Sequence, residues 1–215
     1  LVALATALVP TITEAVAVNN KKRLADTVSM SIMFTAIIGI GTACMFAVFP
    51  HELSVAVYDR YELGDMLIKL VPACPMLYMH IILSGILNGL GEHTFIFRNN
   101  IIASVVNIAF ICYLVPLYGT DAYIAGWCIS LIISVLLGIY KVIKLTGVMF
   151  NAVNWVLKPL ISAAAGGLTA KCVLNYLTPS RLIYVLSAVF MFLMYIIFLF
   201  AMGAVSRNDI KKLKK

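Results

Sequence analysis

Five polar side chains that could take part in binding or proton transfer stand in or beside long apolar stretches of this sequence. Glu14 closes the first stretch and Lys69 opens a later one, while Asn88, Arg98 and Asn107 lie at or after the end of that later stretch. Burying an ionised or amide group among apolar side chains is unfavourable unless it meets a polar partner or a wet cavity. These five residues are therefore the first candidates for a functional site.

The three charged candidates each have two explanations. Lys69 either extends its amine from a helix end to the membrane surface or faces a cavity and meets an anionic substrate. Glu14 is either a solvated carboxylate at headgroup level or one that couples transport to a proton or another ion. Arg98 is explained more simply as an anchor at the membrane surface, with a cavity role as the alternative.

The two asparagines also leave two explanations open. Asn107 interrupts an apolar stretch, so we expect it to face other helices, either in an interhelical hydrogen bond or in ion or substrate binding. Asn88 lies between Gly85 and Gly89, whose spacing is typical of closely packed membrane helices. Ser162, Gly166 and Ala170 predict a second small-residue face. Helix packing is the favoured interpretation of both patterns.

Pro72 and Pro75 interrupt the apolar stretch at residues 66–90. Each proline removes a backbone donor and crowds the preceding turn, so the helix should kink or open between Val71 and Met76. Such a break is tolerated in a membrane where the freed carbonyls meet protein or water. The polar segment at residues 92–100 that follows predicts a hinge.

Composition places the chain in a membrane. Of its 215 residues, 63% are hydrophobic and 12% are charged, whereas soluble domains are about 45–50% apolar and about 25% charged. The net charge of +7 is gathered in short connections and at the C-terminus, which indicates membrane orientation and not nucleic-acid binding. The five cysteines form no CxxC pair and the three histidines lack ligand spacing, so we expect no metal site, no cofactor and no disulfide framework. No catalytic motif supports an enzyme.

The apolar pattern predicts an all-α polytopic helix bundle. It has six full transmembrane spans, at residues 28–49, 66–90, 101–117, 122–140, 159–177 and 182–205. Residues 1–18 have the pattern of the later part of a further span without a signal peptide's basic start, so we interpret the chain as a fragment.

Positive charge predicts the orientation of these spans. Strict alternation puts residues 19–27, 92–100, 141–158 and the C-terminal tail on one side. These segments contain Lys21, Lys22, Arg23, Arg98, Lys141, Lys144, Lys158, Arg207, Lys211, Lys212, Lys214 and Lys215, whereas the opposite connections contain only Arg60 and Arg181. By the positive-inside rule, the side rich in lysine and arginine is cytoplasmic, and the C-terminus lies on that side.

Several stretches together resemble a known transporter superfamily. ALVPTITEA with NNKKRL, then FPHELSVAVY, LSGILNGLGEHTFIFRNNIIASVVNI and YLVPLYGTDAYIAGWCIS are similar to the C-terminal half of the polysaccharide-export branch of the multidrug/oligosaccharidyl-lipid/polysaccharide (MOP) flippase superfamily. Within that branch they resemble the polysaccharide biosynthesis family that includes stage V sporulation protein B. The resemblance is clearest over residues 1–147.

The resemblance implies a fourteen-helix transporter with two lobes around a central cavity. Residues 1–147 would form the C-terminal lobe, and residues 148–215 two accessory helices with a basic cytoplasmic tail. The partners would be the lipid bilayer, the N-terminal lobe and a lipid-linked glycan, with Lys69, Asn88, Arg98 and Asn107 as cavity candidates. Glu14 would be the coupling candidate, with H⁺ or Na⁺ as the ion.

The implied function is flipping of a lipid-linked oligosaccharide or peptidoglycan precursor across the cytoplasmic membrane by alternating access. One alternative is a cation-coupled multidrug antiporter of the same superfamily, which requires an acidic cavity that these spans hardly provide. The other is an inactive, truncated membrane scaffold. Sporulation, capsule and cell wall remain equally open as the setting.

Overall fold

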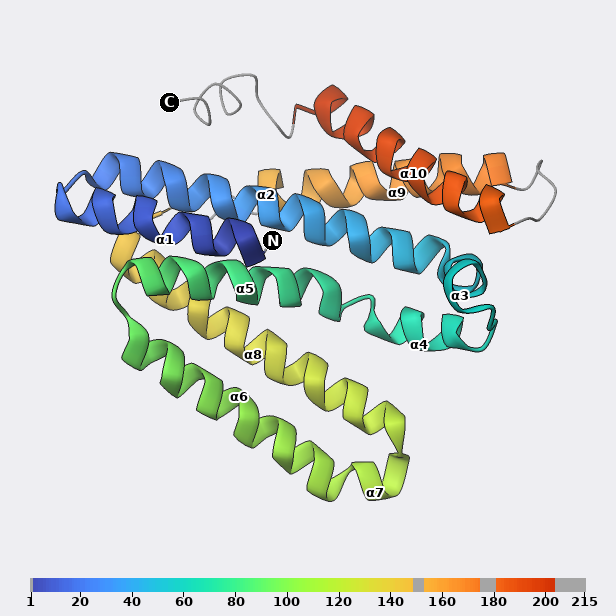
Figure 1. The fold of residues 1–215 in the computed structure, drawn as a ribbon, viewed down its shortest axis with the longest axis horizontal. Coiled ribbons are helices and arrows are strands. Elements are labelled where there is room, and N and C mark those ends of the chain that lie inside the picture. The colour runs from blue at the N-terminus through green and yellow to red at the C-terminus, as the bar shows by residue number, and fades with distance from the viewer. Residues whose placement is uncertain (1, 149–152, 175–180, 204–215) are drawn as a thin grey trace. The chain divides into compact units, whose positions relative to one another are not determined.

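The structure is helical throughout the part of the chain that it describes. This computed structural model describes residues 2–148, 153–174 and 181–203, and no strand occurs within these ranges. The helices, in chain order, are α1 (Val2–Ala17), α2 (Lys21–Val48), α3 (Pro50–Tyr58), α4 (Leu63–Leu70), α5 (Ala73–Gly89), α6 (His93–Tyr113), α7 (Val115–Tyr118), α8 (Thr120–Thr146), the π-helix η1 (Val153–Leu157), α9 (Lys158–Leu174) and α10 (Arg181–Ala201) (Figure 1).

Helix length and apolar composition confirm the predicted fold class. Five of the described helices are long and apolar enough to cross a membrane, and a sixth span results if α4 and α5 are counted together. The six spans expected from the sequence correspond to these. The apolar α1 has 16 residues, fewer than the roughly 20 that a bilayer requires, and it corresponds to the partial span.

The chain breaks at the first of the two prolines that predicted a kink. The α4 helix ends at Leu70 and α5 begins at Ala73, with a bend of 51° between them. Pro72 lies in this two-residue turn, whereas Pro75 is the third residue of α5. A proline in the first turn of a helix removes an N–H that has no partner within the helix in any case, so Pro75 is accommodated without a second break.

The predicted hinge at residues 92–100 is much shorter than expected. The α6 helix already begins at His93, which leaves only residues 90–92 as the connection. Gly91 has a φ of +78° and makes the sharp turn. Residues 93–100 form the first two turns of α6, and Asn99 among them finds hydrogen-bond partners on α8, as described below.

The chain forms two compact units, each built from two separate segments. Unit 1 comprises Leu1–Thr35 and Pro75–Phe150, and unit 2 comprises Ala36–Cys74 and Asn151–Lys215. The α2 helix contributes to both. The sequence-based division into residues 1–147 and 148–215 concerns the lobes of a whole transporter and stays a prediction.

In unit 1, the backbones of α1 and α5 approach closely where α5 has glycines. A Cβ atom added to Gly85 would lie 2.8 Å from the carbonyl oxygen of Ala5, and one added to Gly89 would lie 2.8 Å from Cβ of Ile12. The Thr13 hydroxyl donates a hydrogen bond of 3.1 Å to the carbonyl oxygen of Gly89. Both glycines of this pair therefore lie where α5 contacts α1.

The other half of unit 1 is the antiparallel pair α6 and α8, joined through α7 (Figure 1). Gly119, with a φ of +63°, precedes α8. Gly126 on α8 faces Phe110 on α6, and a Cβ at this glycine would lie 2.5 Å from Cβ of Phe110. Here too the missing side chain determines how near the helices come.

In unit 2, α10 packs against α9 and against the part of α2 that belongs to this unit. The Tyr195 hydroxyl donates a buried hydrogen bond of 2.7 Å to the carbonyl oxygen of Ile37. Its ring covers Gly41, where an added Cβ would lie 2.7 Å from Cε1 of the tyrosine. On α9, Gly166 faces the backbone of α10 and Gly167 faces Val48, which confirms the predicted small-residue face of α9.

The connection between the second and third spans is also ordered. Phe49, just before α3, is fully buried with Ala170 and Met191 in the core of unit 2. The rings of His51 and Tyr61 stack at 4.1 Å, and Nδ1 of His51 lies 3.1 Å from the carbonyl oxygen of Tyr61. This segment is therefore a packed helical turn and not a flexible linker.

We predict that Gly85→Val destabilises the protein by about 1–3 kcal/mol, because the new side chain would be forced against the backbone of α1. Ala125→Val is the matched control, since Ala125 is exposed on α8. Thermal unfolding in detergent followed by circular dichroism would compare the two variants. Equal stability of the two variants would contradict the packing described for α1 and α5.

Candidate functional site

Three helices of unit 1 bring polar side chains together in a cluster of the buried Asn99 on α6, the buried Ser134 on α8 and the half-buried His80 on α5. The amide nitrogen Nδ2 of Asn99 donates to the Ser134 hydroxyl at 2.8 Å and to the Ser134 carbonyl oxygen at 3.1 Å. The same hydroxyl lies 3.0 Å from Nδ1 of His80. Ser134 is thus the centre of a connected polar cluster inside an apolar bundle.

Small residues on α8 make room for this cluster. Gly126, Ser130, Ser134 and Gly138 repeat every four residues and are all buried. Residues at this spacing lie one above another along a single face of the helix. A Cβ at Gly138 would lie 3.2 Å from Leu83, so α5 packs closely one turn beyond Ser134. This packing places His80, one turn before Leu83, beside the serine.

One acceptor of the cluster has no donor in the part of the chain that the structure describes. Asn99 is only 6% exposed, and its Oδ1 accepts no hydrogen bond within the described part of the chain. An unpaired amide oxygen in a low-dielectric interior is costly, so such an atom is where a water or a ligand donor would bind. Oδ1 of Asn107 is the second such atom, about 12 Å further along α6 at 1.5 Å per residue.

The structure places the candidates from the sequence in different surroundings. Asn107 is half-buried, and its Oδ1 accepts no hydrogen bond from a residue that the structure describes, so the partner expected for it stays a prediction. Asn88 is exposed, and its Oδ1 lies 3.1 Å from Nδ1 of His93. Arg98 is exposed next to the buried Asn99. Their roles in a cavity stay predictions.

The two remaining candidates are exposed and have interaction partners. Glu14 is paired with Arg23 at 3.2 Å, and both side chains are about half exposed. Lys69 is exposed in the last turn of α4 and also interacts with another residue. Lys69 belongs to unit 2, whereas the other four candidates belong to unit 1.

Sequence reasoning missed all three residues of the polar cluster. Asn99 was assigned to the hinge, and His80 and Ser134 sit within uncharged spans. The four-residue repeat of glycine and serine on α8 was the available signal, because it marks the face on which a neighbouring helix packs. The partner helices and the register of their contacts are not evident from that repeat.

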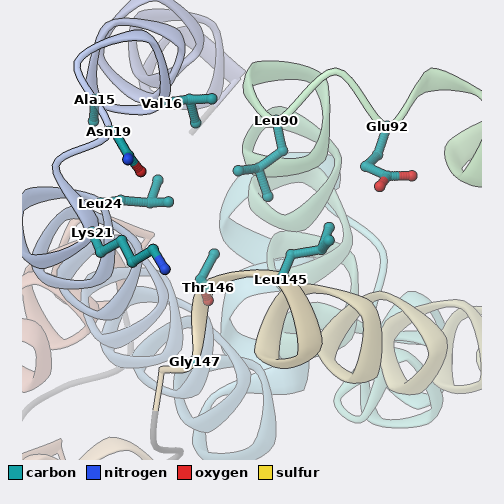
Figure 2. A pocket seen from close by; sticks show the side chains of 10 residues that line it. All are labelled: Ala15, Val16, Asn19, Lys21, Leu24, Leu90, Glu92, Leu145, Thr146 and Gly147. Carbon is teal, nitrogen blue, oxygen red and sulfur yellow. The ribbon is translucent and has the colours of Figure 1, made fainter.

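Unit 1 also has a pocket of about 440 Å³ at the end where its helices turn. Figure 2 shows the side chains that line it. They come from the end of α1, the start of α2, the α5–α6 connection and the end of α8, and they are Ala15, Val16, Asn19, Lys21, Leu24, Leu90, Glu92, Leu145, Thr146 and Gly147. Three of the connections that the charge pattern assigned to one side of the membrane, residues 19–27, 92–100 and 141–158, contribute to this lining.

A salt bridge neutralises the carboxylate of the pocket. Oε1 of Glu92 lies 3.0 Å from Nζ of Lys141, and the same ammonium lies 5.6 Å above the ring of Phe95. Both side chains of this pair are about one-quarter exposed. Across the described residues, no group of three or more His, Cys, Asp or Glu side chains could hold a metal ion.

The fold defines the class of the protein. Its membrane-length apolar helices bury polar side chains between them. On the surface of α6, the apolar side chains of Ile101, Ile102, Val105 and Ile108 are exposed. Exposed apolar faces of this extent are suited to lipid. The chain is a polytopic α-helical membrane protein.

Comparison with known proteins identifies the family. The MatE family model matches residues 1–114, which is more than half of the chain, and the chain belongs to the MatE family. Members of this family are membrane transporters of the MOP superfamily and not enzymes. No curated protein matches the chain.

We predict that Asn99 and Ser134 are energetically coupled. In a double-mutant cycle, Ser134→Ala and Asn99→Ala should show a coupling of about 0.6–1.7 kcal/mol, the range for hydrogen bonds between membrane helices. Equilibrium unfolding in mixed micelles would measure it.

The control cycle pairs Ser134→Ala with Asn107→Ala. Because Asn107 lies two turns from the cluster, these two changes should be additive within about 0.5 kcal/mol. Equal coupling in both cycles, or none in the first, would contradict the hydrogen-bonded cluster.

Proposed function

We propose that the protein takes part in flipping a lipid-linked oligosaccharide or peptidoglycan precursor across the cytoplasmic membrane. Residues 1–147 would act as the C-terminal lobe of the transporter and residues 148–215 as its accessory helices, with the C-terminus in the cytoplasm. The MatE family membership supports transport. The resemblance to the polysaccharide-export branch and to stage V sporulation protein B supplies the substrate class.

The observation that carries the substrate proposal is the position of the carboxylates. Within the described residues, every Asp and Glu lies in a connection or within two turns of a helix end. The buried polar groups of unit 1 include the amide of Asn99 and the hydroxyl of Ser134, with the half-buried imidazole of His80 beside them. A cationic drug would require buried negative charge, whereas uncharged donors and acceptors suit the hydroxyl groups of a sugar.

The candidate residues have separate roles in this proposal. The ammonium of Lys69 would attract the diphosphate of the lipid-linked substrate, since charge-assisted hydrogen bonds to phosphate are strong. The unpaired oxygen of Asn107 would accept a hydrogen bond from a sugar hydroxyl. Asn88 and Arg98 would contact the headgroup nearer the membrane surface.

Glu14 would respond to the coupling ion by exchanging its Arg23 partner. The pair is exposed, and exposed pairs contribute little stability, about 0–1 kcal/mol, so exchange would be easy. Alternating access would then move the headgroup from one side of the membrane to the other.

The test is to deplete the protein in its host and measure the lipid-linked precursor on the cytoplasmic leaflet. We expect the precursor to accumulate, and wild-type protein to reverse this. Lys69→Ala and Asn107→Ala should rescue transport at least several-fold less well, at equal amounts of protein in the membrane.

Ser104→Ala is the control, because Ser104 is an exposed residue of the same helix as Asn107 and should rescue fully. Normal precursor levels with normal envelope polymers after depletion would overturn the flippase proposal. Drug sensitivity without precursor accumulation would instead favour the multidrug antiporter.

A further inference from the structure

The pocket at the turning end of unit 1 has one ammonium without a counter-ion among the residues that the structure describes. Lys21 forms no ion pair with any other residue that the structure describes, whereas the lining carboxylate Glu92 is held by Lys141. The Lys21 side chain points across the pocket toward Thr146, and the amide of Asn19 faces the same space (Figure 2). The pocket therefore has a net positive charge on one wall.

Two leucines lie across the pocket from Lys21. They are Leu90 and Leu145 (Figure 2), and Leu145 remains 42% exposed. A volume of about 440 Å³ falls within the range of about 300–1,000 Å³ that is typical of ligand pockets. A ligand that suits both walls is amphiphilic, with a negative group beside Lys21 and a hydrocarbon part against the leucines.

The position of the pocket agrees with such a ligand. The chain reverses between α1 and α2 and between α5 and α6 beside the pocket, and α8 ends there (Figure 1). The ends of membrane helices lie at the level of the lipid headgroups. Basic pockets between helix ends at this level are suited to anionic lipid headgroups.

The helix termini indicate where in the pocket the negative group would lie. The carboxyl ends of α1 and α8 carry partial negative charge and disfavour an anion, whereas α2 begins at Lys21 and its amino end favours one. The Thr146 hydroxyl donates to the carbonyl oxygen of Val142 at 2.8 Å, which leaves Lys21 as the main donor. The phosphate would therefore sit beside Lys21.

We propose that this pocket binds the phosphate headgroup of an anionic membrane lipid, with Lys21 holding the phosphate and Leu145 contacting an acyl chain. Such a lipid would join the ends of α1, α2, α5 and α8. The proposal does not depend on the transported substrate.

The test measures lipid binding to the purified protein by native mass spectrometry in mixed micelles. Dioleoyl phosphatidylglycerol should bind about five-fold more tightly than dioleoyl phosphatidylcholine, the preference expected from one lysine near the headgroups. Lys21→Gln should abolish this preference, and Lys21→Arg should retain it. Lys22→Gln is the matched control, because Lys22 is its exposed neighbour outside the pocket and should leave the preference unchanged.

A second set of measurements distinguishes a lipid from a free phosphate. Leu145→Ala should weaken binding of the long-chain lipid while leaving circular dichroism unchanged, since Leu145 is partly exposed. Inorganic phosphate should compete no better than a neutral salt of equal ionic strength. Equal effects of Lys21→Gln and Lys22→Gln, no preference for phosphatidylglycerol, or competition by inorganic phosphate would each overturn the proposal.

Discussion

Close approach of helix backbones is the constraint on which the packing of this protein depends. In lipid, apolar side chains gain little by leaving their surroundings, so helices associate through contact at short range and through hydrogen bonds. Gly85 and Gly89 allow α5 to pack closely on α1. Gly126 packs against Phe110, and Gly166 packs against the backbone of α10. Each contact is shorter than a larger side chain would permit, and the buried polar groups are placed by these contacts.

The polar groups are segregated by charge. Ionised pairs such as Glu14 with Arg23 and Glu92 with Lys141 lie where the helices end, whereas the cluster around Ser134 contains an amide, a hydroxyl and an imidazole. The reason is the free energy of transfer from water to an apolar interior. This free energy is more unfavourable for a full charge than for an amide or hydroxyl group that keeps its hydrogen bonds. A membrane transporter can therefore keep selective polar contacts in its interior without a buried ion pair.

The sequence predicted the spans well because each depends on local composition. The apolar runs and the break at Pro72 follow from residues adjacent in the chain. Asn99 was misassigned to a hinge for the opposite reason: its partner Ser134 is 35 residues away on α8, and Ser134 in turn contacts His80 on α5. Glu14 was recognised as polar and noteworthy, but its partner Arg23 follows a chain reversal. Contacts between helices depend on rotation and register, which composition does not specify.

The contact between Tyr195 and α2 constrains how this protein can vary. The tyrosine ring occupies the space left by Gly41, and its hydroxyl shares the Ile37 carbonyl oxygen that lies four residues before that glycine. A larger residue at position 41 is therefore compatible only with a smaller one at position 195, and such a pair would lose the hydroxyl that satisfies this carbonyl. The two halves of this contact thus constrain each other although the hydrogen-bonded residues are 158 positions apart in the sequence.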